Sequence, residues 1–249
     1  MRTFVLLFLY VIIVVLAIPV LLICGIFRWL PPVVFVGRSG VRLGKSVLGV
    51  RIEVSGFEHV DFDRTYVYMP NHISFLDGPM MFIVLPCFVR VIAKQELFRV
   101  PFLAQAMRVA EFIPVDRKGQ EGGKKAIQRA VRLIREKGHP FLIFPEGTRS
   151  LDGRLQRFRR GGFYLALETG SPIVPVSIIG SYELMPKKAF FTKRGTIIVK
   201  IHPPVSVDGF DVDTMPDLIE KVRETVAAGV RDTVNPNLPA GARSEGQGG

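Results

Sequence analysis

The sequence predicts an α/β domain with a largely parallel, mixed sheet of about seven strands flanked by helices, preceded by a hydrophobic two-helix membrane anchor at the N-terminus. Three observations support this prediction. Short runs rich in β-branched residues alternate with helical patterns through most of the 249 residues. Polar motifs follow several of these runs. The start of the chain has almost no charge, although the whole chain carries a net charge of +11.

The composition excludes two other classes of protein. Hydrophobic residues make up 48% of the chain, which is too many for a disordered protein. The two cysteines, Cys24 and Cys87, lie far apart in unlike surroundings and cannot build a disulfide framework. The cysteine usage therefore favours a reducing compartment.

The first predicted element is a hydrophobic helix over residues 3–29. Residues 3–27 contain no charged side chain, and at ~1.5 Å per residue a helix of this length crosses the ~30 Å hydrocarbon layer of a bilayer. A secretory signal peptide fits poorly, because the apolar stretch is too long and no small-residue cleavage pattern follows it. We prefer a turn at Trp29–Pro32 that leads into an interfacial helix, and the alternative is a single membrane span.

The second predicted element is a basic amphipathic helix over residues 32–49. Its apolar residues recur near helical spacing and its basic residues gather on the opposite face: Val33, Val36, Leu43 and Val47 against Arg38, Arg42 and Lys45. Such a helix is suited to the membrane interface, and the alternative is a helix packed on a soluble core. The excess of basic residues after the hydrophobic helix predicts that the next domain lies on the cytoplasmic face of the cell membrane.

Residues 51–232 are predicted to form one α/β domain, and residues 233–249 a disordered tail. The predicted strands are 50–54, 65–69, 89–93, 111–115, 141–144, 173–178 and 196–201. The predicted helices are 79–85, 101–107, 123–137, 161–169 and 215–230. Ligands of sheets with this alternation bind at the carboxyl ends of the strands.

Nearly all of the net positive charge lies between residues 90 and 160. A basic surface on a membrane-attached domain attracts anionic headgroups, phosphate-bearing substrates or an acidic carrier protein. The chain has no zinc-ligand spacing, no basic-zipper heptads and no RNA-binding aromatic signature. Nucleic acid is therefore not expected as a partner.

The first candidate site follows the predicted strand 65–69, in the segment Asn71-His72-Ile73-Ser74-Phe75-Leu76-Asp77. On a regular helix the side chains of His72 and Asp77 would diverge by ~140°, so they meet only if His72 lies in a loop before the helix. A carboxylate beside an imidazole fixes its tautomer and makes its other nitrogen a general base. The alternative is a capping box with Ser74 as the N-cap. Two ligands are too few for a metal site, and none is predicted.

The second candidate site is the segment 144–150, Phe-Pro-Glu-Gly-Thr-Arg-Ser, which follows the predicted strand 141–144. Its glycine allows the backbone to approach a ligand, and Arg149 offers a bidentate fork for a phosphate. Arg117 could supply a second fork at the end of the run 111–115. The alternatives are a polar turn for the segment and a surface ion pair for Arg117. Pro175 in the predicted strand 173–178 indicates an edge, a bulge or a functional bend.

These motifs together resemble those of the glycerolipid acyltransferase family. The family's N-H-x-x-x-x-D motif matches Asn71, His72 and Asp77, and its F-P-E-G-T-R-S motif matches residues 144–150 in full. Its V-P-V motif matches residues 174–176, and a looser motif places its arginine at Arg117. The resemblance extends from about residue 56 to about residue 201 and is closest to bacterial members that acylate 1-acyl-sn-glycerol 3-phosphate.

The resemblance implies a reaction. An acyl chain would pass from an acyl thioester to the sn-2 hydroxyl of 1-acyl-sn-glycerol 3-phosphate (lysophosphatidic acid), which gives phosphatidic acid in phospholipid biosynthesis. His72 would be the general base and Asp77 would orient it. The donor would be acyl-CoA or acyl-carrier protein, with no cofactor. The alternatives are an acyltransferase for glycerol 3-phosphate or another lysolipid, and a non-catalytic membrane adaptor that binds lipid.

The resemblance also implies the residues that bind the acceptor. The phosphate and glycerol would contact Arg117, Glu146, Gly147, Thr148 and Arg149. Weaker candidates for the site are Lys94, Asn71 and Pro175. Of these, Pro175 would shape the site, and Lys94 is a candidate because of its charge and its position at a strand end.

Overall fold

The computed structural model describes residues 29–100, 103–116 and 120–238, together with scattered positions between 8 and 27. Most of the predicted hydrophobic helix 3–29, Arg117 and residues 239–249 therefore lie outside the described residues. In the part of the chain that is described, no helix is both long enough and apolar enough to cross a bilayer. The membrane anchor stays a prediction from the sequence.

A seven-stranded sheet forms the centre of the molecule. Its strands are β1 (Val50–Ser55), β2 (Val67–Pro70), β3 (Arg90–Lys94), β4 (Ile113–Val115), β5 (Phe141–Leu142), β6 (Ile173–Ile179) and β7 (Gly195–Ile201). They lie in the order β1-β7-β6-β2-β5-β3-β4, and all neighbours pair in parallel except the antiparallel pair β6 and β7. The predicted largely parallel α/β fold is confirmed.

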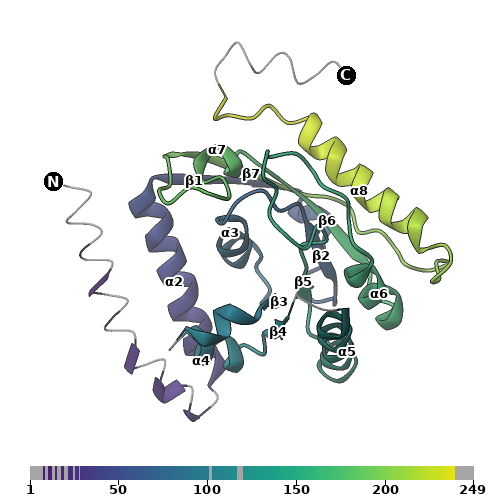
Figure 1. The fold of residues 1–249 in the computed structure, drawn as a ribbon, viewed down its shortest axis with the longest axis horizontal. Coiled ribbons are helices and arrows are strands. Elements are labelled where there is room, and N and C mark those ends of the chain that lie inside the picture. Colours follow the sequence, from purple (N-terminus) through teal and green to yellow (C-terminus); the bar gives the residue numbers. More distant parts are fainter. Residues whose placement is uncertain are drawn as a thin grey trace.

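Helices cover both faces of this sheet (Figure 1). They are α2 (Leu30–Leu48), α3 (Asp77–Val84), α4 (Leu103–Val109), α5 (Gln120–Lys137), α6 (Arg160–Thr169), α7 (Ser181–Leu184) and α8 (Met215–Arg231), with 3-10 helices η1 (Phe57–His59) and η2 (Gln95–Arg99). α3 packs on one face of the sheet, with α2 beside it, and α5, α6 and α8 pack on the other. Each face has its own hydrophobic core. Strand β2 contributes Tyr68 to the core under α3 and Met69 to the core under α5, α6 and α8, because successive side chains of a strand point to opposite faces.

Helix α2 differs from the predicted interfacial helix in one respect. Arg38, which the periodicity places on the basic face of the helix, points toward the end of α3 and donates hydrogen bonds to the carbonyl oxygens of Leu85 (2.8 Å) and Cys87 (2.9 Å). The last carbonyls of a helix lack partners within it, and a guanidinium satisfies several at once. Arg38 therefore holds α2 against the end of α3, whereas Trp29 and Phe35 remain largely exposed.

Several element boundaries differ from those predicted. Strand β4 begins at Ile113 rather than at residue 111, because Glu111 adopts a left-handed backbone with φ of 56° in the turn after α4. The short elements η1, η2 and α7 were not predictable from periodicity, since each is too short to show one.

The end of the described chain also differs from the predicted tail. The side chain of Asn237 donates hydrogen bonds to the carbonyl oxygens of Gly180 (2.9 Å) and Thr196 (2.7 Å), and it accepts one from the Thr196 N–H (3.0 Å). Residues up to 237 are thus held against the start of β7. The ordered domain extends beyond the predicted boundary at residue 232.

Candidate active site

The turn between β2 and α3 brings His72 and Asp77 together. Strand β2 ends at Pro70 and α3 begins at Asp77, so His72 lies in the intervening turn. The Asp77 carboxylate folds back over this turn: Oδ2 lies 2.9 Å from His72 Nδ1 and accepts hydrogen bonds from the backbone N–H groups of Ile73 and Ser74, each at 2.7 Å. The two predicted residues are therefore in direct contact.

The capping box, which is the alternative interpretation of this motif, is formed only in part, because α3 begins at Asp77 with Leu76 rather than Ser74 as its N-cap. Ser74 Oγ accepts the Leu76 N–H at 3.2 Å, while the Asp77 carboxylate accepts the Ser74 N–H. The same carboxylate thus stabilises the start of the helix and contacts the imidazole. The two interpretations do not exclude each other.

The fourth partner of this carboxylate is Ser181, which no sequence motif indicated. Ser181 Oγ donates a 2.6 Å hydrogen bond to Asp77 Oδ1, and both side chains are buried. Ser181 begins α7 directly after β6, and β6 pairs with β2 in the sheet. Only the strand order brings these residues together, and a single sequence does not reveal that order.

The hydrogen bonds determine the tautomer of His72. The Asp77 side chain has no exposed surface, and its oxygens accept from three other donors, so it acts as an acceptor toward the imidazole. His72 Nδ1 must then carry the proton, which leaves Nε2 with a lone pair. The ring stacks on Phe144, with centroids 4.0 Å apart, and its side chain is 18% exposed. The contacts with Asp77 and Phe144 hold the ring in place, and in the neutral tautomer Nε2 is its acceptor nitrogen.

Glu146 joins the second motif to the first. Its Oε1 accepts the His72 N–H at 2.7 Å and its Oε2 accepts the Gln156 N–H at 3.2 Å, while the Ser150 N–H donates to the His72 carbonyl at 2.8 Å. These bonds hold the segment 144–150 against the turn that carries His72. Glu146 thereby holds the turn that carries His72, and contact with the glycerol of an acceptor stays a prediction from the resemblance.

Burial raises the pKa of the Glu146 carboxyl to about 7, although its hydrogen bonds from His72 and Gln156 oppose this shift. The folded chain therefore keeps this proton to a higher pH than the unfolded chain, where the usual pKa of 4.5 applies. Folding stability due to Glu146 is lost as the pH rises from about 4.5 through about 7.

We expect Glu146→Gln to remove this part of the pH dependence. Urea unfolding of both proteins at several pH values between 5 and 8 measures it. The difference in unfolding free energy, wild type minus variant, should fall as the pH rises, because only the wild type titrates at this position. Parallel curves across this range would contradict the raised pKa.

Cationic side chains gather around the segment 147–149. The Arg149 guanidinium lies 5.6 Å from the centroid of the Phe75 ring, and Lys187 Nζ donates to Thr148 Oγ1 (3.1 Å) and the Arg149 carbonyl (3.0 Å). Gly147 has φ of 73°, and a Cβ built on it would lie 2.8 Å from Arg159 Nε. Glycine thus leaves room for a third cation. Within the described residues none of the three cations forms an ion pair with a carboxylate.

The remaining predicted residues lie in different places. The Asn71 side chain joins the end of β2 to β6: its Nδ2 donates to the Ile178 carbonyl (2.9 Å), and its Oδ1 accepts the Ile178 N–H (2.7 Å). Pro175 lies in β6, which is an interior strand, one residue before the ladder with β7 begins. The missing N–H therefore disrupts no bond to β7, and the edge alternative is excluded. Lys94 pairs with Glu96 at 3.1 Å rather than with either motif.

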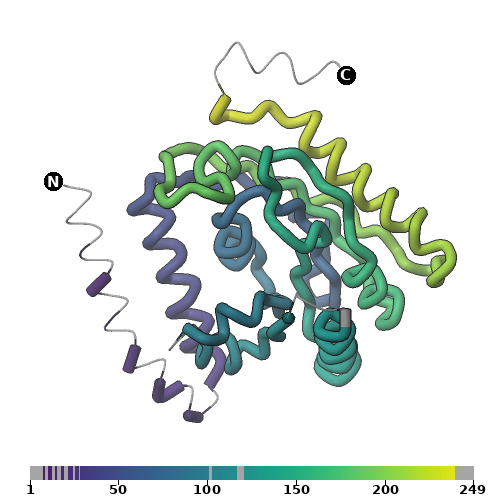
Figure 2. The backbone as a smooth tube through the Cα atoms, in the orientation of Figure 1, coloured from purple at the N-terminus to yellow at the C-terminus, as the bar shows by residue number. Residues whose placement is uncertain are grey.

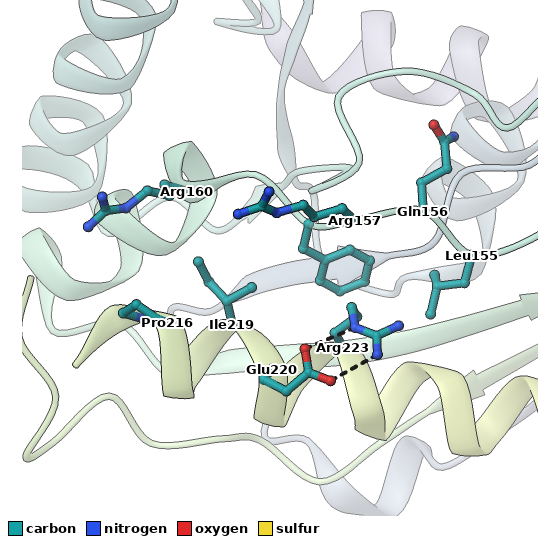
Figure 3. A pocket seen from close by; sticks show the side chains of 9 residues that line it. Leu155, Gln156, Arg157, Arg160, Pro216, Ile219, Glu220 and Arg223 are labelled. Atoms are coloured by element: carbon teal, nitrogen blue, oxygen red, sulfur yellow. Dashed lines mark hydrogen bonds and ion pairs between the residues drawn. The ribbon is translucent and has the colours of Figure 1, made fainter. Parts of the chain in front are cut away.

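A hollow of about 430 Å³ lies between residues 155–160 and helix α8 (Figure 3). Arg157 and Arg160 line it, and Glu220 and Arg223 of α8 form a 2.8 Å ion pair across its floor. Gln156 also lines it and donates to Glu146, so this hollow borders the second motif. His72 does not line it.

An oriented histidine base beside a group of cations is suited to activating a hydroxyl group on a phosphate-bearing acceptor. Transfer of a group to such a hydroxyl is one reaction that this arrangement supports. The chain belongs to the acyltransferase family: a sequence model described as Acyltransferase matches residues 51–179.

Individual relatives agree with this assignment. The chain is 32% identical over 200 residues to a 1-acyl-sn-glycerol-3-phosphate acyltransferase of Limnanthes douglasii, covering 80% of this chain and 68% of that protein. It is 30% identical over 171 residues to the protein of the same name from Borreliella burgdorferi, covering 68% of each. The crystal structure of the 1-acyl-sn-glycerophosphate (LPA) acyltransferase PlsC from Thermotoga maritima is similar with a TM-score of 0.77 at 27% identity, covering 93% of this chain and 95% of that one.

Proposed function

We propose that the chain transfers an acyl group from a thioester to the sn-2 hydroxyl of 1-acyl-sn-glycerol 3-phosphate, with His72 as the general base. The observation that carries the proposal is the 2.9 Å contact between His72 Nδ1 and Asp77 Oδ2, which leaves Nε2 free. The names of the relatives support the acceptor.

The reaction needs no covalent intermediate on the protein. His72 Nε2 takes the proton of the acceptor hydroxyl as its oxygen attacks the thioester carbonyl. The Asp77 carboxylate stabilises the imidazolium that forms. When the C–S bond breaks, the imidazolium returns its proton to the leaving thiolate. Because a thioester is already activated, positioning both substrates in one complex is sufficient.

The acceptor phosphate binds the cations around residues 147–149. Arg149 offers a bidentate fork, and Arg159 and Lys187 add positive charge on either side of Gly147. Arg117, which lies outside the described residues, is proposed as a second fork on the resemblance alone.

The donor and the location of the enzyme are also proposals. The donor is acyl-CoA or acyl-carrier protein, both of which present a thioester from water. The acceptor is a membrane lipid, and the charge-free stretch 3–27 followed by basic residues supports attachment to the cell membrane with the domain on the cytoplasmic face.

We expect Arg149→Ala to raise the KM for 1-acyl-sn-glycerol 3-phosphate by about 10-fold to 150-fold, because a hydrogen bond to a charged group contributes about 1.5–3 kcal/mol. The KM for monoacylglycerol, which lacks the phosphate, should not change. The assay measures acyl transfer by the full chain with acyl-CoA and with acyl-carrier protein.

Arg154→Ala is the matched control for Arg149→Ala, because Arg154 lies in the same loop with its side chain largely exposed.

The same assay tests the acceptor. Glycerol 3-phosphate and other lysolipids, offered as competing acceptors, should be acylated more slowly. Faster transfer to any of them would overturn the proposed acceptor, and no transfer to any acceptor would favour the lipid-binding adaptor.

A further inference from the structure

The segment between α7 and β7 presents two phenylalanines to solvent. Phe190 is 91% exposed and Phe191 is 88% exposed, more than any other large hydrophobic side chain among the described residues. Exposing two adjacent aromatic side chains in this way is unfavourable in water. Such a site marks a contact with a protein or a membrane.

The charge around this pair distinguishes between these partners. Residues 185–194 contain no acidic side chain, and the phenylalanines are flanked on both sides by cations: Lys187, Lys188, Lys193 and Arg194. Aromatic rings at a loop tip with a basic rim match the two layers of an anionic bilayer surface, with an apolar interior beneath negatively charged headgroups. The segment is complementary to a lipid surface in both polarity and charge.

This segment is fixed to the catalytic turn at its base. Ser74 Oγ donates a 2.7 Å hydrogen bond to the Met185 carbonyl, and Lys187 Nζ contacts Thr148 and the Arg149 carbonyl. The Lys193 N–H donates to the Leu184 carbonyl at 2.9 Å and closes the loop. Insertion of the loop tip would therefore bring the acceptor site to the depth of the headgroups.

The segment also meets the end of α2, the helix that the sequence assigns to the membrane interface (Figure 2). The Gly195 N–H lies 3.4 Å from the Gly49 carbonyl, and a Cβ built on Gly49 would lie 2.8 Å from Arg194 Cγ. Arg42 and Lys45 of α2 thus lie within two turns of this junction. The base of the loop and the C-terminal end of α2 thus lie side by side.

We propose that residues 186–194 are a membrane-docking loop, in which Phe190 and Phe191 insert into an anionic bilayer and the flanking Lys188, Lys193 and Arg194 bind its headgroups. The proposal rests on the proposed function only in that the acceptor is drawn from the same bilayer. The N-terminal anchor would hold the protein on the membrane, and this loop would set the orientation of the catalytic domain.

A fluorescent label tests insertion directly. Phe191→Cys is labelled with the dye NBD in a full-length chain that carries Cys24→Ser and Cys87→Ala, and is reconstituted in vesicles containing phosphatidylglycerol. The emission should shift to the blue and be quenched by lipids with a shallow doxyl group. The same label at Val212→Cys, an exposed position before α8, should report water.

Three outcomes would overturn the proposal. The label at residue 191 could report water in these vesicles, or shift equally in vesicles of phosphatidylcholine alone. It could also shift in detergent solution in proportion to protein concentration, which would assign the loop to contact with a second copy of the chain.

An activity measurement separates this proposal from the function itself. Phe190→Ser/Phe191→Ser should lower acyl transfer to a vesicle-bound acceptor by about tenfold or more, because burial of one phenylalanine alone corresponds to at least that factor. Transfer to a soluble short-chain acceptor should be unchanged, as should both rates for the control Val212→Ser/Val234→Ser. Equal loss on both acceptors would overturn the docking loop, whereas an inserted label on a chain that transfers no acyl group would overturn only the proposed function.

Discussion

Replacing His72 with alanine lowers kcat for acyl transfer by about 10²-fold to 10⁴-fold, the usual range for loss of a general base. The fold should persist, because the two backbone hydrogen bonds of residue 72, to Glu146 and from Ser150, do not involve the imidazole. The measurements are kcat with acyl-CoA and the midpoint of thermal unfolding.

The matched control is His59→Ala. The His59 ring lies near the surface and contacts Glu58 rather than either motif, so both activity and stability should stay close to wild type. If His72→Ala retained full activity, a different group would have to be the base. If it lost activity and also failed to bind lysophosphatidic acid, the imidazole would bind the acceptor rather than activate it.

The contact between His72 and Asp77 was predictable from local sequence, because the two residues lie within one turn. A strand, a proline and a short helix follow one another, and this order leaves His72 in the loop and Asp77 at the helix start. Local geometry is what a single sequence specifies best. The local sequence left the imidazole contact and the cap as alternatives, and in the structure the Asp77 carboxylate contacts both His72 Nδ1 and the Ser74 N–H.

The residues that sequence analysis missed are those that depend on strand order. Ser181 and Lys187 reach the site because β6 lies next to β2. In the chain, more than a hundred residues separate Ser181 from Asp77. No spacing rule links residues this far apart. The pairing of strands decides their contact, and pairing depends on packing across the whole sheet.

The contact that Arg38 makes was not predictable for a different reason. Helical periodicity shows which residues share a face but not which neighbouring element covers that face. The periodicity places the Arg38 guanidinium on the basic face of α2, and only the structure shows that it binds the carbonyls at the end of α3. Long basic side chains are ambiguous in this respect, because they reach both solvent and unpaired carbonyls.

The second large effect is expected at Asp77. Asp77→Ala should destabilise the fold by about 3–5 kcal/mol, because it leaves the N–H groups of Ile73 and Ser74 without their acceptor in a buried site. It should also abolish measurable transfer, since the imidazole loses its orienting partner. Urea unfolding and the transfer assay measure the two losses separately.

Two further variants separate the structural role of Asp77 from its electrostatic role. Asp77→Asn keeps an oxygen for the backbone N–H groups and for His72, and its amide can donate to Ser181 Oγ, so most of the stability should return. The kcat of Asp77→Asn should remain on the order of 10²-fold below that of wild type, because no negative charge faces the imidazolium that forms during the reaction. Ser181→Ala removes one of the four hydrogen bonds and should lower kcat by less, with KM unchanged. If Asp77→Asn were as active as wild type, the carboxylate would serve only to cap the helix, and the charge relationship between Asp77 and His72 would play no part in the reaction.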